Sequence, residues 1–115
     1  MSAFSQLDLQ QVQELAGDAA GLSALVAQFD LSLAEELARL DDDVTQSNAA
    51  EFALHLHALK GFVPLFSKSD LAQQIVALYA HCRQSPWNDT LRDWVQLRPR
   101  LLSLQQEVRT ARQGL

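Results

Sequence analysis

Apolar residues recur along most of this chain at steps of three and four, the spacing that gathers side chains on one face of an α-helix. The longest apolar stripe contains Leu22, Leu25, Val26, Phe29, Leu33, Leu37, Leu40 and Val44. It corresponds to about seven helical turns. No stretch alternates apolar and polar residues at the period of two that indicates a β-strand. The pattern therefore predicts an all-α protein.

Four further stripes complete this pattern. A short one, formed by Leu9, Val12 and Leu15, predicts a short N-terminal helix that ends at Gly17. The others are one within residues 52–66, one formed by Leu71, Ile75, Leu78 and Cys82, and one formed by Trp87, Leu91, Trp94, Leu97, Leu101, Leu104, Val108 and Ala111. Connections of a few residues favour an antiparallel up-and-down four-helix bundle with an additional short N-terminal helix. The tryptophans are expected to fill the core or a bundle end.

Helix starts and stops follow from single residues. The candidate N-caps are Asp8, Asp18, Ser47 or Asn48, and Ser67 with Asp70. Oxygens of such side chains accept hydrogen bonds from the first free backbone N–H groups of a helix. Pro64 predicts a kink or a stop between Phe62 and Phe66, because proline removes a backbone donor and crowds the preceding turn. Pro99 interrupts the last stripe and is expected to bend that helix.

Composition narrows the class of protein. The 115 residues fit one domain, in which residues 1–7 are expected to be a loose lead-in and residues 112–115 a frayed end. The net charge of −5 and the nine scattered Lys and Arg argue against nucleic-acid binding. No apolar run approaches the roughly 20 residues that cross a bilayer, and the N-terminus lacks a signal-peptide pattern. We therefore expect a soluble cytoplasmic protein that does not bind membranes.

No metal site and no cofactor is predicted. The acidic run Asp41–Asp43 is expected to be a solvated helix end, because consecutive helical residues point in different directions. His55 and His57 are two residues apart, whereas two metal ligands on one helix need a spacing of three or four. His81 and Cys82 are adjacent and diverge in the same way. Cys82 is expected to be a small core residue, and as the only cysteine it cannot form an internal disulfide.

The stretch around His57 presents two contrasting faces. At about 100° per residue, the predicted core face holds Phe52, His55, Leu56, Leu59, Phe62, Val63 and Phe66. The opposite face holds Ala50, Ala53, His57, Gly61 and Pro64, with Leu54, Lys60 and Leu65 at its margins. His55 is thus expected to be half-buried and hydrogen-bonded, and His57 to be exposed among small residues. Gly61 leaves space one turn further on, although glycine costs about 1 kcal/mol in a helix interior. Access to His57 is our candidate reason for that cost.

The run His57-Ala58-Leu59-Lys60-Gly61 resembles the His-x-Leu-Lys-Gly signature of histidine-containing phosphotransfer (HPt) domains, the four-helix-bundle intermediates of multistep phosphorelays. The chain length, the helical pattern and the place of the run on the third major helix agree with this resemblance. It implies that His57 accepts a phosphoryl group on Nε2 from a receiver-domain aspartate and passes it to another receiver domain in a two-component pathway.

The same resemblance implies roles for the neighbours of His57. Lys60 would contact the phosphoryl oxygens, and Gly61 would leave room for them. The face that docks the receiver would comprise Ala50, Ala53, Leu54, Pro64 and Leu65. The implied partners are receiver domains of response regulators or a hybrid histidine kinase, and the receiver would supply magnesium and most of the catalytic charge. The protein would then be a phosphocarrier without kinase activity of its own, and we expect a monomer.

The run also departs from the family pattern. Small residues commonly follow the Lys-Gly pair, whereas this chain has Phe62 and Val63, and Pro64 stands where alanine or glycine is usual. These departures leave open a second interpretation, a helical interaction module that binds a receiver domain or kinase without being phosphorylated. A third is the phosphoacceptor part of a sensor kinase, but an acidic residue usually follows that histidine where this chain has Ala58.

Overall fold

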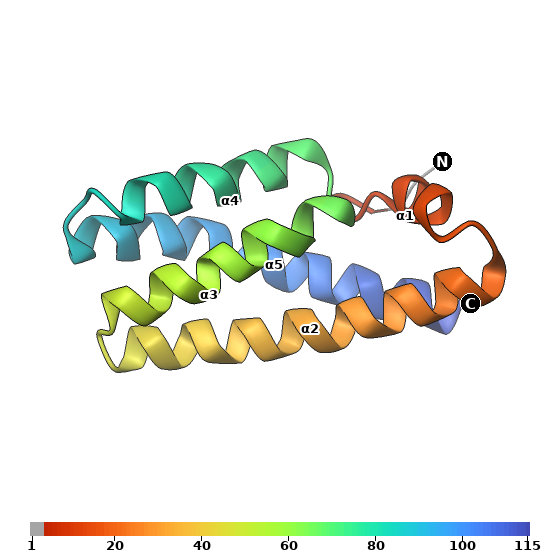
Figure 1. Ribbon diagram of the computed structural model, residues 1–115, viewed down its shortest axis with the longest axis horizontal. Helices are drawn as coiled ribbons and strands as arrows, with labels where there is room; N and C mark the ends of the chain where they lie inside the picture. Colours follow the sequence, from red (N-terminus) through yellow and green to blue (C-terminus); the bar gives the residue numbers. More distant parts are fainter. Residues whose placement is uncertain (1–3) are drawn as a thin grey trace.

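The computed structural model describes residues 4–115, which form five α-helices and one 3₁₀ turn (Figure 1). The elements are α1 (Leu9–Ala16), α2 (Ala19–Thr45), α3 (Ala49–Phe62), η1 (Val63–Leu65), α4 (Ser69–Cys82) and α5 (Trp87–Gln113). Helices α2 to α5 run in alternating directions, and α2 and α4 each pack against both α3 and α5. The predicted all-α bundle with a short N-terminal helix is confirmed. No helix of the described residues is long and apolar enough to cross a membrane.

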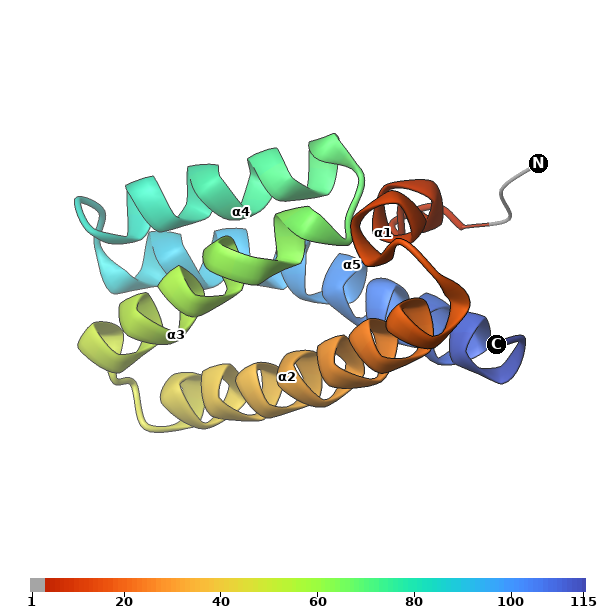
Figure 2. The same ribbon diagram turned by 45° about the vertical axis from the view of Figure 1, so that its right-hand side comes forward.

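The bundle helices differ in length. Helices α2 and α5 have 27 residues each, and α3 and α4 have 14 each. At about 1.5 Å per residue, the long pair extends well beyond the short pair. Helix α1 packs against α2 in this region, next to the turn that follows α3 (Figure 2). The short helix therefore covers core that α3 and α4 are too short to reach.

Two aromatic clusters fill the interior. The ring of Phe29 on α2 stacks on that of Phe66, with 3.9 Å between ring centroids. Phe52 on α3 meets Trp87 and Trp94 of α5 edge-on, with centroids 5.4 Å apart in both pairs. Edge-to-face pairs at such distances stabilise a core beyond the area that they bury. Trp94 is buried in the core and Trp87 is half-buried against it, in agreement with the expectation that the tryptophans fill the core or a bundle end.

Three of the four predicted N-caps form. Side-chain oxygens of Asp8, Asp18 and Asn48 each accept a hydrogen bond from the backbone N–H three residues further on. Ser67 does not act as a cap, because α4 begins two residues later, after Lys68. The backbone of Ser67 instead forms an isolated antiparallel bridge with Leu7, and its hydroxyl group is buried without a partner within the described residues.

Proline ends one helix and is tolerated in another. Helix α3 stops at Phe62, and the chain continues as η1, which contains Pro64, so the predicted stop is confirmed. The side-chain amide of Gln11 on α1 donates to the carbonyl oxygens of Pro64 and Leu65, at 3.0 and 2.7 Å. These bonds satisfy acceptors that a continuing helix would have used. Helix α5, by contrast, continues through Pro99.

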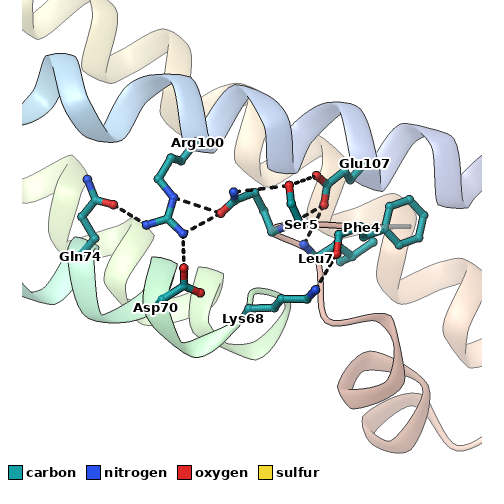
Figure 3. Close-up of polar contacts among 9 residues, drawn as sticks. Phe4, Ser5, Leu7, Lys68, Asp70, Gln74, Arg100 and Glu107 are labelled. Carbon is teal, nitrogen blue, oxygen red and sulfur yellow. Dashed lines mark hydrogen bonds and ion pairs between the residues drawn. The ribbon is translucent and has the colours of Figure 1, made fainter. Parts of the chain in front are cut away.

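Residues 4–7, here called the N-terminal segment, are bound to α5 (Figure 3). One carboxylate oxygen of Glu107 accepts hydrogen bonds from the backbone N–H groups of Gln6 and Leu7, both at 2.9 Å. The Leu7 side chain is 1% exposed. The expected loose lead-in is therefore wrong for residues 4–7, because a carboxylate and an apolar anchor fix them, while residues 1–3 lie outside the described residues.

Polar side chains extend this attachment across α4 and α5 (Figure 3). Arg100 donates to side-chain oxygens of Gln6, Asp70 and Gln74, at 3.0, 2.6 and 2.6 Å. The hydrogen bond from Arg100 lowers the pKa of Asp70. The ammonium of Lys68 donates to a backbone carbonyl of the N-terminal segment. The N-terminal segment, the start of α4 and α5 are thus joined by polar contacts.

Candidate functional site

His57 lies near the middle of α3, on the face turned away from the core. Its side chain is exposed, while Leu56 and Leu59 are fully buried. Within residues 4–115, neither ring nitrogen of His57 makes a hydrogen bond or an ion pair. The predicted exposure is confirmed, and both nitrogens are open to a reagent.

Helix α4 supplies the closest ring to His57. The centroid of the Tyr79 ring lies 5.2 Å from that of the His57 imidazole, with 45° between the ring planes. The ammonium of Lys60 lies 4.6 Å from the same centroid, and the guanidinium carbon of Arg83 lies 5.7 Å from it. Both cations are within the range of a cation–π contact. The Tyr79 ring is therefore the common neighbour of one imidazole and two positive charges.

These two cations differ from the others in the chain. Of nine Lys and Arg, seven bond to a carboxylate or a carbonyl within the described residues, namely Arg39, Lys68, Arg92, Arg98, Arg100, Arg109 and Arg112. Lys60 and Arg83 make no such bond within residues 4–115 and contact the Tyr79 ring instead. In a protein of net charge −5, the two cations without such a bond thus lie together beside the exposed histidine.

A shallow groove of about 450 Å³ lies along the last turns of α4, beside Lys60 of α3. It is lined by Lys60, Val76, Tyr79, Ala80, Arg83 and Gln84. Positive charge with aromatic and apolar walls suits an anionic group, because the charge attracts the anion and the walls exclude competing water. The groove can therefore hold a phosphoryl group or a carboxylate close to His57.

Exposed apolar side chains lie along α3 and η1 and, at Val76, in the groove itself. Leu54, Leu65 and Val76 are 61%, 48% and 48% exposed. Ala50 is exposed, and Ala53 and Pro64 are half-buried. The predicted docking residues thus follow about 22 Å of α3 and η1 at 1.5 Å per residue, and Val76 of α4 adds to them. Scattered exposed apolar residues are common, but several of them along one stretch of α3 and η1 are typical of an interaction surface.

Gly61 is not required by the fold. A Cβ atom at this position would have no neighbour within 4 Å, and the backbone has no positive φ that favours glycine. An alanine here would therefore favour the helix by about 1 kcal/mol. The open space over Gly61 adjoins Lys60 and lies one turn from His57, as the sequence pattern predicts.

His55 and the acidic run behave differently from His57. The Nδ1 of His55 donates to a carboxylate oxygen of Asp43 on α2, so the predicted half-buried, hydrogen-bonded histidine is confirmed. Asp43 is 5% exposed, and Asp41 receives two hydrogen bonds from Arg98, both at 2.8 Å. The expectation of a wholly solvated acidic run is therefore wrong. Asp41 and Asp43 join α2 to α5 and α3, and of the three only Asp42 is fully exposed.

The other candidate ligands lie on the opposite side of α4 or in its packing. His81 is exposed and lies 3.8 Å from Asp93, and Cys82 is half-buried, with a thiol whose pKa is raised by burial. Within residues 4–115, no group of three His, Cys, Asp or Glu side chains could hold a metal ion.

Sequence reasoning missed Tyr79, Val76 and Arg83. Tyr79 lies at the margin of the α4 stripe, one residue after the buried Leu78, so periodicity alone assigned it no role. The sequence does contain one indication of their role. Tyr79 and Arg83 are four residues apart and are therefore neighbours on one helix face. Placing that face beside His57 required the pairing of α3 with α4.

Comparisons with known proteins found no matching family model, no matching curated protein and no matching solved structure. A functional interpretation therefore rests on the residues around His57 and on their geometry.

Proposed function

We propose that this protein is a phosphorelay intermediate of the histidine-containing phosphotransfer type, which carries a phosphoryl group on His57 between receiver domains. The observation that supports this most is the placement of Lys60 and Arg83, the two cations that bond to neither a carboxylate nor a carbonyl within the described residues, on the ring beside an exposed, unbonded imidazole. Such an arrangement leaves the nucleophile accessible and provides charge for an anionic group next to it.

The chemistry suits an unbonded imidazole. With an unperturbed pKa near 6.5, a histidine side chain offers a neutral, nucleophilic nitrogen at about pH 7. In the proposed step, the lone pair of His57 Nε2 attacks the phosphorus of an aspartyl phosphate on the partner. The Nε2–P bond forms and the P–O bond to the aspartate breaks, with its electron pair leaving on the carboxylate. The Nδ1 proton stays on the ring, and the reverse step passes the group to a second receiver.

Lys60, Arg83 and Gly61 assist this transfer. Phosphoryl transfer proceeds through a loose transition state in which charge is spread over the oxygens, so positioning and nearby cations do most of the work. A phosphoryl group carries a charge of about −1.5 to −2 at pH 7. We assign Lys60 and Arg83 to neutralise part of it, and Gly61 to admit its oxygens.

Docking would use apolar residues of α3 and η1 together with Val76 in the groove. The proposed receiver-binding surface comprises Ala50, Ala53, Leu54, Pro64, Leu65 and Val76. A relay partner must dissociate after transfer, so we expect an interface of about 1,200 Å² or less. Receiver domains or a hybrid kinase are the proposed partners, and a monomeric cytoplasmic phosphocarrier without kinase activity is the proposed state.

The first experiment is intact mass spectrometry after incubation with phosphoramidate, a small phosphoryl donor that requires no partner. Wild type should gain one acid-labile phosphoryl group, and His57→Gln should gain none. The matched control is His81→Gln, which removes the other exposed histidine and should leave the labelling unchanged. Labelling of His57→Gln, or loss of labelling in His81→Gln alone, would place the acceptor elsewhere.

The second candidate function is a non-phosphorylated module that binds a receiver domain or kinase. The observation in its favour is the proline-containing turn η1, which reshapes the docking surface directly beyond Gly61. A folded wild type that takes up no phosphoryl group but binds receiver domains with a dissociation constant in the micromolar range would support it. Self-phosphorylation of this chain with ATP alone would instead support a part of a sensor kinase.

A further inference from the structure

Tyr79 connects the two groups on which the proposed transfer depends. Its ring lies 5.2 Å from the His57 ring and 4.6 Å from the Lys60 ammonium, measured from its centroid. His57 and Lys60 come from α3, one turn apart, whereas Tyr79 comes from α4. The contact therefore depends on helix packing and not on the local conformation of α3.

The imidazole has few other restraints. Within residues 4–115 no hydrogen bond holds either ring nitrogen, and exposed side chains change rotamer on the picosecond to nanosecond scale. An aromatic ring packed beside the imidazole limits these rotamers without occupying a nitrogen. A hydrogen-bond donor to Nε2 would also restrain the ring, but it would compete with the incoming phosphorus for the nucleophilic lone pair.

The ammonium of Lys60 is held in a similarly weak way. A cation–π contact at an exposed site is weak compared with a charge-assisted hydrogen bond to a phosphoryl oxygen. Lys60 can therefore rest on the Tyr79 ring before transfer and move to the phosphoryl group once it arrives. An ion pair with a carboxylate would hold Lys60 more firmly and would also cancel its charge.

We infer that Tyr79 is a positioning residue of the phosphoacceptor site, whose ring restrains the His57 imidazole and holds the Lys60 ammonium within reach of the incoming phosphoryl group. This inference rests on the proposed phosphocarrier function. It concerns the ring and not the hydroxyl group, for which the described residues provide no hydrogen-bond partner.

Three versions of the protein test the role of the ring. Tyr79→Phe keeps the ring and removes the hydroxyl group, and Tyr79→Leu keeps an apolar side chain at this half-buried position and removes the ring. The first readout is the rate of phosphoramidate labelling by intact mass. Tyr79→Phe should label within about twofold of wild type, and Tyr79→Leu about three- to tenfold more slowly, the range expected for loss of a weak orienting contact.

The second readout is the proton NMR spectrum of the three histidine rings. The ring current of Tyr79 shifts the ring protons of His57, so these resonances should move in Tyr79→Leu and stay close to wild type in Tyr79→Phe. Those of His55 should stay in place in both variants, because His55 contacts Asp43 on α2 and not Tyr79. A residue that only fills space would leave the labelling rate of the folded Tyr79→Leu variant unchanged.

The outcomes separate the two proposals. Wild type that is not labelled would overturn the phosphocarrier function, and with it the role of Tyr79. Wild type that is labelled at the same rate as Tyr79→Leu would overturn the positioning role alone. A Tyr79→Phe variant as slow as Tyr79→Leu would also overturn it, because the hydroxyl group and not the ring would then be required.

Discussion

Asp43, close to the end of α2, accepts a hydrogen bond from Nδ1 of His55 on α3, and this contact distinguishes two histidines that are only two residues apart. At about 100° per residue they point to nearly opposite sides of the helix. His55 joins α3 to α2, whereas His57 lies beside the Tyr79 ring of α4. Removal of His55 is therefore predicted to affect stability, and removal of His57 to affect phosphorylation.

His55→Ala should destabilise the fold but leave phosphorylation of His57 unchanged. Without His55, the carboxylate of Asp43, which is 5% exposed, keeps its burial and loses its partner. We expect a loss of about 1–2 kcal/mol in the free energy of unfolding, measured by urea denaturation, because a buried polar group is left unsatisfied. Phosphoramidate labelling at a temperature where the variant is folded should match wild type. His57→Gln should show the reverse, with labelling lost and the urea midpoint unchanged. If both variants lost stability and labelling together, the assignment of separate roles to His55 and His57 would be wrong.

Glu107→Gln should weaken the fold in a pH-dependent manner. Burial alone would raise the pKa of Glu107, but hydrogen bonds from the backbone N–H groups of Leu7 and Gln6 and from Ser5 outweigh it and lower the pKa below its ordinary value of 4.5. A lowered pKa in the folded state stabilises the protein above the unfolded pKa, and this contribution disappears as pH falls through the folded value.

At pH 7 the variant should therefore lose about 1 kcal/mol, allowing for solvent screening of a half-buried carboxylate. Its melting temperature should fall by about 4 °C. The difference from wild type should narrow as the pH drops below about 4.5, the ordinary pKa of a glutamate. Thermal melts across this range test the sign, and a difference that grows on acidification would show that the carboxylate charge does not stabilise the N-terminal segment.

Much of the fold could be predicted because it depends on local rules. Apolar periodicity identified each helix, and the caps Asp8, Asp18 and Asn48 form as expected. Ser67 failed as a cap because its surroundings include residue Leu7, sixty positions earlier in the chain, and a local motif carries no information about such a partner. The attachment of the N-terminal segment was missed for the same reason.

In the candidate site, too, the residues on one helix could be predicted from the sequence and those brought in by helix packing could not. His57, Lys60 and Gly61 share one helix, so spacing alone placed them on one face. Tyr79 and Arg83 come from the next helix, and their contact with this face depends on how α3 and α4 are rotated against each other. Helix periodicity predicts which side of a helix is buried, but not which of its margin residues meets which neighbour.

Lys60→Ala should slow transfer from a phosphorylated receiver without affecting the fold. Its ammonium makes no ion pair within the described residues, so its removal leaves no carboxylate without a partner. Loss of one charge-assisted contact to the phosphoryl oxygens should reduce the rate about tenfold. The control is Lys68→Ala, which removes the other lysine, at the far end of α4, and should leave the transfer rate unchanged. Rapid-quench kinetics measure the transfer rate of both variants. Equal transfer rates for Lys60→Ala and Lys68→Ala would show that Lys60 takes no part in the mechanism.

Substitutions at Gly61 distinguish the approach of a receiver domain to His57 from the reactivity of His57 itself. Because a Cβ atom here has no neighbour within 4 Å, Gly61→Ala should raise the free energy of unfolding by up to about 1 kcal/mol.

Gly61→Gln should also fold, since its longer side chain enters solvent, but it would occupy the space in which a receiver approaches His57. Phosphoramidate is small enough to reach the imidazole in both variants, so their labelling rates should match wild type. Transfer from a phosphorylated receiver should be about tenfold slower or more in Gly61→Gln, because a small misplacement of reacting groups is costly. Equal receiver-driven rates in the two variants would show that the partner does not approach over Gly61, and the docking surface would then have to lie toward Leu54 and the start of α3.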